Sequence, residues 1–200
     1  NNSSINYDEG TSCADIENDG DQDIIVTSLY TTLELYVQTH SIRFQEQAHE
    51  RGLGHVLGRA YSAIWGDVNN DGSIDLFVSL EDSSNRLFLN DGAGFFRDVT
   101  VAAGLYVSRG GVGSMFSDID LDGDLDLFVP RYGARNLLYR NEGSLAGVPR
   151  FLEIGRSAGV AGVDSTARSS SGVFADVDND GDLDLFVTNL TCANWFYLND

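Results

Sequence analysis

Four short segments of the sequence carry oxygen-rich side chains at alternating positions. They begin at Asp15, Asp67, Asp118 and Asp176. Positions 1, 3, 5 and 9 of each segment hold Asp, Asn or Glu, and position 6 is Gly in all four. Calcium takes about six to eight oxygen ligands in proteins, and glycine permits the positive φ that bends a chain around an ion. The pattern therefore predicts one calcium site in each segment, about four in all.

The expected ligands are the side chains at positions 1, 3, 5 and 9 and the backbone carbonyl of position 7. Position 7 is Asp in three loops and Ser in the other, as expected if its side chain does not bind. The third and fourth loops carry complete Asp sets and should bind calcium most tightly. Asn69 removes one charge from the second loop, and the longer side chain of Glu17 fits the first loop less well. The predicted metal-site residues are Asp15, Glu17, Asp19, Asp21, Asp23, Asp67, Asn69, Asp71, Ser73, Asp75, Asp118, Asp120, Asp122, Asp124, Asp126, Asp176, Asp178, Asp180, Asp182 and Asp184.

The residue types argue against several other kinds of metal site. An all-oxygen ligand set disfavours zinc, copper and iron, and magnesium prefers fewer carboxylates and more water. An EF-hand places Glu at position 12, whereas this position holds Val26, Val78, Val129 and Val187. The alternative is a set of solvated turns, but four uncompensated acidic clusters would repel at close range.

The loops recur about every fifty residues, which is the period of a β-propeller blade. Short apolar runs rich in β-branched and aromatic residues flank them, such as 63–65 before the second loop and 76–78 after it. We predict an all-β fold of propeller-type blades, each with four antiparallel strands and an acidic loop between its first two strands. The result is a partial propeller, or an open array completed by an oligomer. A stacked sandwich or an open β-solenoid is the alternative.

The expected strand order defines the repeats of this single domain. Fourth strands are predicted at 42–44, 95–96 and 151–154. Asn-Asp-Gly at Asn90 and Asn-Glu-Gly at Asn141 predict tight turns after the third strands. The repeats span approximately 1–57, 58–109, 110–166 and 167–200, and the last is incomplete.

Charge and composition limit the partners of the chain. It has 31 acidic residues against 12 basic ones, for a formal net charge of −19, so nucleic acid and anionic membrane surfaces repel it. The sequence has no apolar run of the roughly 20 residues that a membrane helix needs. We therefore expect no nucleic-acid partner and no membrane insertion. Cys13 and Cys192 are too few for a disulfide scaffold, and they either pair with each other or lie buried as thiols.

The loops and their surroundings resemble the FG-GAP and VCBS repeats, the family that builds the integrin α-subunit propeller. The resemblance rests on the Asp-x-Asp-x-Asp-Gly-x-x-Asp loops and on residues 85–96. Residues 98–105 look like the related repeats of cartilage acidic protein type. The resemblance implies calcium in the loops and a secreted or cell-surface location. Propellers of this family usually have about seven blades, so we expect a piece of a longer protein, or open edges that pair with another copy.

Three functions are compatible with this organisation. The first, which we favour, is an extracellular adhesion or ligand-binding module with structural calcium and a protein or glycan partner. The second is the propeller domain of a polysaccharide-active enzyme, such as a lyase or dehydratase, with His40, His49 and His55 as candidate acid–base residues. The third is a subunit that assembles into a fibre or surface array through open sheet edges. In the favoured interpretation the histidines are surface or turn residues, and we assign no catalytic residue.

Other residues have structural interpretations. Arg59, Arg109 and Arg168 precede first strands, where they are expected to pack or to balance charge. Trp65 and Trp195 are expected to pack in the core. Three asparagines begin N-glycosylation triplets, which fits an extracellular location: Asn1, Asn2 and Asn189.

Overall fold

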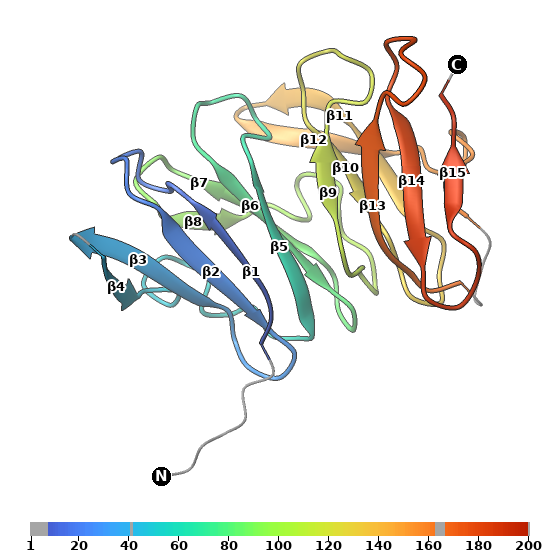
Figure 1. Cartoon of the computed structure of the whole chain (residues 1–200). Helices are drawn as coiled ribbons and strands as arrows, with labels where there is room; N and C mark the ends of the chain where they lie inside the picture. The colour runs from blue at the N-terminus through green and yellow to red at the C-terminus, as the bar shows by residue number, and fades with distance from the viewer. Residues whose placement is uncertain (1–7, 41, 163–166, 200) are drawn as a thin grey trace.

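The computed structural model describes residues 8–40, 42–162 and 167–199. These residues form fifteen strands in four antiparallel sheets and no helix. Figure 1 shows the sheets following one another side by side in chain order, without closing into a ring. The predicted all-β architecture of propeller-type blades is confirmed.

Among the described residues, three sheets have four strands and the fourth has three. The first contains β1 (Asp8–Ala14), β2 (Asp23–Ser28), β3 (Glu34–His40) and β4 (Arg43–Glu46). The second contains β5 (Ala60–Gly66), β6 (Asp75–Leu80), β7 (Arg86–Asn90) and β8 (Phe96–Asp98). The third contains β9 (Met115–Ser117), β10 (Asp126–Val129), β11 (Leu137–Leu145) and β12 (Val148–Glu153). The fourth contains β13 (Ser169–Ala175), β14 (Asp184–Asn189) and β15 (Trp195–Tyr197).

Within each sheet, strands that are consecutive in sequence are neighbours. The first strands contact one another from sheet to sheet, β1 with β5, β5 with β9 and β9 with β13. Each acidic loop joins the first strand of its sheet to the second, as predicted. All four loops therefore lie at the same end of their sheets, in Figure 1 at the top for β5–β6 and β13–β14.

The second strands are apolar runs because they are buried on both faces. Every residue of β6 is buried. Successive side chains of a strand point to opposite faces, so Leu76 and Val78 join the core between the first and second sheets. Phe77 joins the core between the second and third sheets. Full burial of each such side chain contributes roughly 1.5–3 kcal/mol, and this continuous burial holds neighbouring sheets together.

Asparagines of the third strands add a polar link between sheets. The Asn90 side chain donates from Nδ2 to the carbonyl of Ile16 in the first sheet's loop, at 2.8 Å, and to that of Ile74 at 3.1 Å. Asn141 repeats this contact one sheet later, donating to the carbonyl of Val68 at 2.9 Å. The sequence indicated both asparagines only as turn residues, and their role as inter-sheet links was missed.

The tight turn predicted at Asn141 is wrong. Strand β11 continues to Leu145, and the chain reverses at Ala146 and Gly147, both with positive φ. The pairing of β11 with β12 shifts register between Asn141 and Ser144. A bulge there absorbs the Asn-Glu-Gly sequence, because Gly143 adopts a φ of 77° inside the strand.

Two further expectations about side chains meet different outcomes. Both alternatives for Cys13 and Cys192 are wrong, because the two thiols are free and exposed. Trp65 and Trp195 are partly buried and pack against the first and third core clusters, as predicted. Of the glycosylation triplets, Asn1 and Asn2 lie outside the described residues.

Candidate metal centre

The first carboxylate of each loop organises the bend. In the third loop Asp118 accepts the backbone N–H of Asp122 through Oδ1 and that of Gly123 through Oδ2, both at 3.0 Å. The first two loops make the same pair of bonds at 2.8–3.0 Å. Gly123 has a φ of 92°, a conformation that other residues adopt only with strain. The position-6 glycine is therefore required by the turn itself.

The ninth residue of each loop is a buried aspartate that opens the second strand. Asp126 is 1% exposed and accepts two backbone N–H groups, from Ile119 at 2.8 Å and from Asn141 at 2.7 Å. One carboxylate thus joins the loop, the second strand and the third strand. The corresponding carboxylates of Asp23, Asp75 and Asp184 make the same two contacts.

Burial changes the acidity of these carboxyl groups. Desolvation raises the pKa of Asp75 to about 7 and that of Asp126 to about 6, although two backbone N–H groups lower each pKa in part. The pKa of Asp23 is raised for the same main reason. A carboxylate that is costly to ionise in the absence of a cation favours a bound divalent ion, and metal binding then releases protons.

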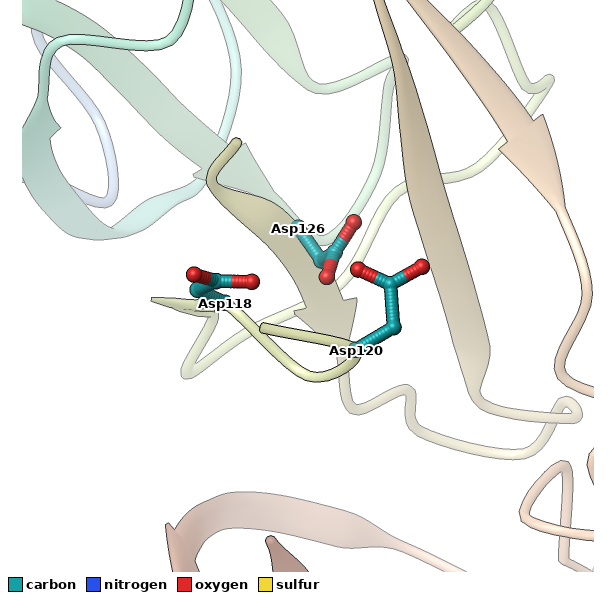
Figure 2. Close-up of side chains that lie close together, drawn as sticks. All are labelled: Asp118, Asp120 and Asp126. Carbon is teal, nitrogen blue, oxygen red and sulfur yellow. The ribbon is translucent and has the colours of Figure 1, made fainter. Parts of the chain in front are cut away.

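The third and fourth loops each bring three acidic side chains together. Carboxylate oxygens of Asp118, Asp120 and Asp126 lie within 4.8 Å of one another, and Figure 2 shows the three groups facing a common space. Asp176, Asp178 and Asp184 form the same cluster in the fourth loop. Oxygens on opposite sides of a calcium ion are separated by about 5 Å, because each Ca–O distance is about 2.3–2.6 Å. The donor type and spacing therefore fit a calcium ion.

The sequence unit of acidic loop and following strands recurs along most of the chain. A model of the FG-GAP-like repeat matches residues 15–78, 67–129 and 118–187, so that each match runs from one acidic loop to the strand beyond the next. The chain belongs to the FG-GAP-like repeat family. The resemblance noted from the loops and from residues 85–96 is confirmed.

The curated relatives that this chain matches are longer proteins. Cartilage acidic protein 1 of Xenopus tropicalis is 29% identical over 144 residues, which cover 72% of this chain and 21% of the relative. The Homo sapiens protein of the same name is 27% identical over 150 residues, covering 74% of this chain and 22% of the relative. The chain thus spans about a fifth of the length of these relatives.

Three solved structures share the fold at low sequence identity. A Vibrio cholerae biofilm matrix protein, Bap1, superposes with a TM-score of 0.55 and 16% identity over 96% of this chain and 31% of its own. An Agrocybe aegerita lectin that recognises non-reducing terminal N-acetylglucosamine superposes with a TM-score of 0.52 and 18% identity, over 90% of this chain and 46% of its own. The exotype rhamnogalacturonan lyase YesX superposes with a TM-score of 0.51 and 15% identity, over 90% of this chain and 38% of its own. No helix among the described residues is long and apolar enough to cross a membrane.

Not all predicted ligands of the FG-GAP-like loops lie in the clusters. Position 5 turns toward the backbone, where Asp122 and Asp180 accept the N–H of position 7 at 2.9 and 3.0 Å. The carboxylate of Asp124, at position 7, accepts Nδ2 of Asn70 at 2.6 Å instead. Positions 1, 3 and 9 thus form each cluster. The ligand roles of positions 5 and 7 stay predictions.

The first two FG-GAP-like loops differ from the others at position 3. Glu17 forms an ion pair with Arg51 of the first sheet's final turn, so its carboxylate already has a partner. Asn69 donates from Nδ2 to Asp71 at 2.8 Å and to the carbonyl of Gly147 at 3.2 Å. Both position-3 side chains thus have partners outside the ligand set, and weaker calcium binding by the first two loops stays a prediction.

The histidines lie in the first FG-GAP-like repeat, outside the acidic clusters. His40 ends β3. His49 and His55 are exposed in the turns after β4, with ring centroids 5.8 Å apart. The pair lies edge to face, as in an ordinary surface ring contact.

The recurring arginines lie at the other end of the sheets. Arg59 forms an ion pair with Glu81 at 2.8 Å, and the guanidinium of Arg168 stacks over the ring of Tyr132, 4.5 Å from its centroid. Arg109 offers its carbonyl to the guanidinium of Arg131 at 3.0 Å. Arg59 therefore balances charge and Arg168 packs, which are the two roles expected from the sequence.

Proposed function

We propose that this chain is a calcium-binding FG-GAP-like module whose ions are structural. The observation that carries the proposal is the convergence of three carboxylates within 4.8 Å in each of the third and fourth loops. Carboxylates at this distance repel one another in the absence of a cation. A bound calcium ion removes this repulsion, and its binding free energy then adds to the stability of the fold.

The chain's own residues explain how an ion in the loop would stabilise a whole sheet. The position-9 carboxylate of each cluster also holds the backbone of the third strand. An ion bound by Asp126 or Asp184 therefore restrains the loop and two strands at once. We propose two strong sites, in the third and fourth loops, and two weaker sites in the first and second.

Calorimetric titration with calcium, together with melting curves in calcium and in chelator, tests this proposal. We expect about two tight ions and a melting temperature that falls in chelator. The double substitution Asp118→Asn and Asp176→Asn should remove tight binding, whereas Glu50→Gln, an exposed acid outside the loops, should not. A melting temperature unmoved by chelator would show that the loops are solvated turns.

We further propose that the module acts outside the cell and binds a protein or a glycan. The supporting feature is a surface at the end of the sheets opposite the acidic loops, formed by Tyr61, Tyr132 and Arg168. The rings of Tyr61 and Tyr132 lie 6.0 Å apart, edge to face, and the exposed Arg168 covers the second ring. Aromatic faces pack against sugar rings, and guanidinium groups bind the carboxylates of acidic sugars. The fold is shared with a lectin and a rhamnogalacturonan lyase.

Binding to a glycan panel tests the ligand role. The panel should contain terminal N-acetylglucosamine and rhamnogalacturonan fragments, and the readout is affinity at saturating calcium. We expect Arg168→Ala or Tyr132→Ala to weaken binding about tenfold or more, while Arg156→Ala, an exposed arginine in another turn, has no effect. Equal binding by all variants would place the glycan site elsewhere on the chain, and equal absence of binding would exclude the glycans of the panel.

A further inference from the structure

The second and third acidic loops contact each other directly. The side chain of Asn70, at position 4 of the second loop, donates from Nδ2 to Oδ1 of Asp124 at 2.6 Å. Asp124 is position 7 of the third loop and lies 54 residues further along the chain. A second bond ties the same loop to the third sheet, because Asn69 donates from Nδ2 to the carbonyl of Gly147 between β11 and β12. The third sheet therefore holds the second loop at two points.

The bond from Asn70 joins the ligand-bearing parts of the two loops. Asn70 lies between positions 3 and 5 of the second loop and has a φ of 57°. Asp124 lies between Asp120 and Asp126, whose carboxylates belong to the cluster of the third loop. Binding of an ion by that cluster would fix the segment on both sides of Asp124. The bond from Asn70 would then carry this restraint into the second loop.

The other neighbouring loops of the chain lack this link. Position 4 of the first loop is Asn18 and position 7 of the second is Ser73, and no hydrogen bond joins their side chains in the part of the chain that the structure describes. Position 4 of the third loop is Leu121, whose side chain has no hydrogen-bond donor. The contact is thus specific to the second and third loops.

We infer that Asp124 is a positioning residue for the second calcium site, so that calcium binding in the third loop tightens calcium binding in the second. The inference rests on the proposed calcium sites. A loop that is already ordered loses less conformational entropy when it binds its own ion, which gives positive cooperativity. The effect is reciprocal, because each ion must change the affinity for the other by the same factor. Direct repulsion between the two cations acts in the opposite direction, so the sign of the cooperativity is informative.

Calcium titration followed by NMR resolves the loops within the intact chain. The amide groups of Gly72, Gly123 and Gly181 donate to the first aspartate of the second, third and fourth loops, so their resonances report the three loops separately. Asp120→Asn weakens the third site. This substitution should lower the calcium affinity that Gly72 reports by about threefold to tenfold, as expected for the loss of one hydrogen-bonded restraint. The affinity that Gly181 reports should not change.

Two substitutions at position 4 test whether the bond carries the effect. Asn70→Leu removes the donor, and Asp120→Asn should then no longer change the affinity that Gly72 reports. Leucine fits the backbone there, because Leu121 holds the same position of the third loop with a φ of 59°. Asn179→Leu is the matched control, since Asn179 has a φ of 63° in the fourth loop and its side chain has no hydrogen bond to the described residues. The control should leave the effect of Asp120→Asn intact.

Two results would overturn the inference. The first is an affinity at Gly72 that stays the same, or rises, when Asp120→Asn is introduced. The second is an effect of Asp120→Asn that survives Asn70→Leu. The cooperativity would then run through the bond from Asn141 to the carbonyl of Val68, which all of these variants retain.

The same titration separates this inference from the calcium proposal on which it rests. If Gly123 and Gly181 respond to calcium while Gly72 does not, the inference fails and the proposed sites in the third and fourth loops stand. If none of the three glycines responds to calcium, the proposed function fails as well.

Discussion

Replacing Asp120 with Asn separates a metal-binding role from a structural one, because the two roles predict opposite effects without calcium. Asp120 is exposed, and its carboxylate lies within 4.8 Å of those of Asp118 and Asp126. The pKa of Asp120 is raised by desolvation and by the charge of Asp122. Each like-charge contact at this distance costs about 1 kcal/mol in a water-like dielectric. Asp120→Asn should therefore leave the metal-free chain as stable as before or slightly more stable.

With calcium the same substitution should destabilise the chain. Removing one charged ligand of a calcium site lowers affinity by about 10- to 100-fold, which reduces stabilisation at saturating calcium by about 1.4–2.7 kcal/mol. For a domain of this size the melting temperature should fall by roughly 3–10 °C. The reciprocal substitution, Asn69→Asp, completes the second loop and should raise the melting temperature in calcium while lowering it in chelator.

The assay is calorimetric melting of the parent chain and both variants, each in saturating calcium and in excess chelator. The quantity that decides is the difference between the two conditions for each protein. If Asp120→Asn lowers the melting temperature equally in both, Asp120 stabilises the loop by contacts of its own and the carboxylate cluster is not a metal site. If Asn69→Asp destabilises in calcium as well, the second loop does not hold an ion.

Three further predictions concern groups around the clusters. In chelator, Asp75 and Asp126 have pKa values of about 7 and 6 in the folded chain, against about 3.9 in the unfolded chain. Their contribution to the free energy of unfolding is therefore greatest at low pH and is lost as pH rises from about 4 to 7. Urea unfolding in chelator should show stability falling over this range, and calcium should reverse the trend. Asn141→Ala leaves the carbonyls of Val68 and Leu125 without their side-chain donor and should cost about 2–4 kcal/mol in urea unfolding, whereas the exposed Asn194→Ala should cost less; equal losses would refute the inter-sheet link. Arg51→Met frees Glu17 from its ion pair and should tighten calcium binding at the first loop. The same substitution should destabilise the chain by roughly 1–3 kcal/mol, since Arg51 is 8% exposed. Unchanged affinity in a calcium titration would mean that Glu17 is no ligand.

The sequence predicted the sheets well because hydrophobic pattern and turn chemistry agree there. The run Leu76–Val78 is apolar at every position, since both of its faces meet a neighbouring sheet. The run of β11 beyond Asn141 could not be predicted in the same way. Asn-Glu-Gly has the composition of a tight turn, and only pairing with β12 converts it into a bulge within a longer strand. Local propensity yields to cross-strand pairing in such cases.

The loops were also predictable, but the division of roles within each loop was not. Spacing alone treats positions 1, 3, 5 and 9 as equivalent oxygen donors. In the structure Asp122 satisfies a backbone N–H of its own turn, whereas Asp126 is buried and holds the third strand. Glu17 could be recognised as a poor ligand from its length, but its partner Arg51 lies 34 residues away in sequence. Such long-range partners are a property of the fold and leave no local signal.

The buried aspartate at position 9 links metal binding to the stacking of the sheets. Asp126 accepts the backbone N–H of Asn141, and the side chain of Asn141 donates to the carbonyl of Val68 in the preceding sheet. An ion that fixes Asp126 therefore also fixes the residue that joins the third sheet to the second. The same two bonds connect Asp75, Asn90 and Ile16 one sheet earlier. The second and third loops thus each hold their own sheet and the contact with the sheet before it, so a calcium ion in either loop should stabilise two sheets and the cooperativity of unfolding should depend on the ions.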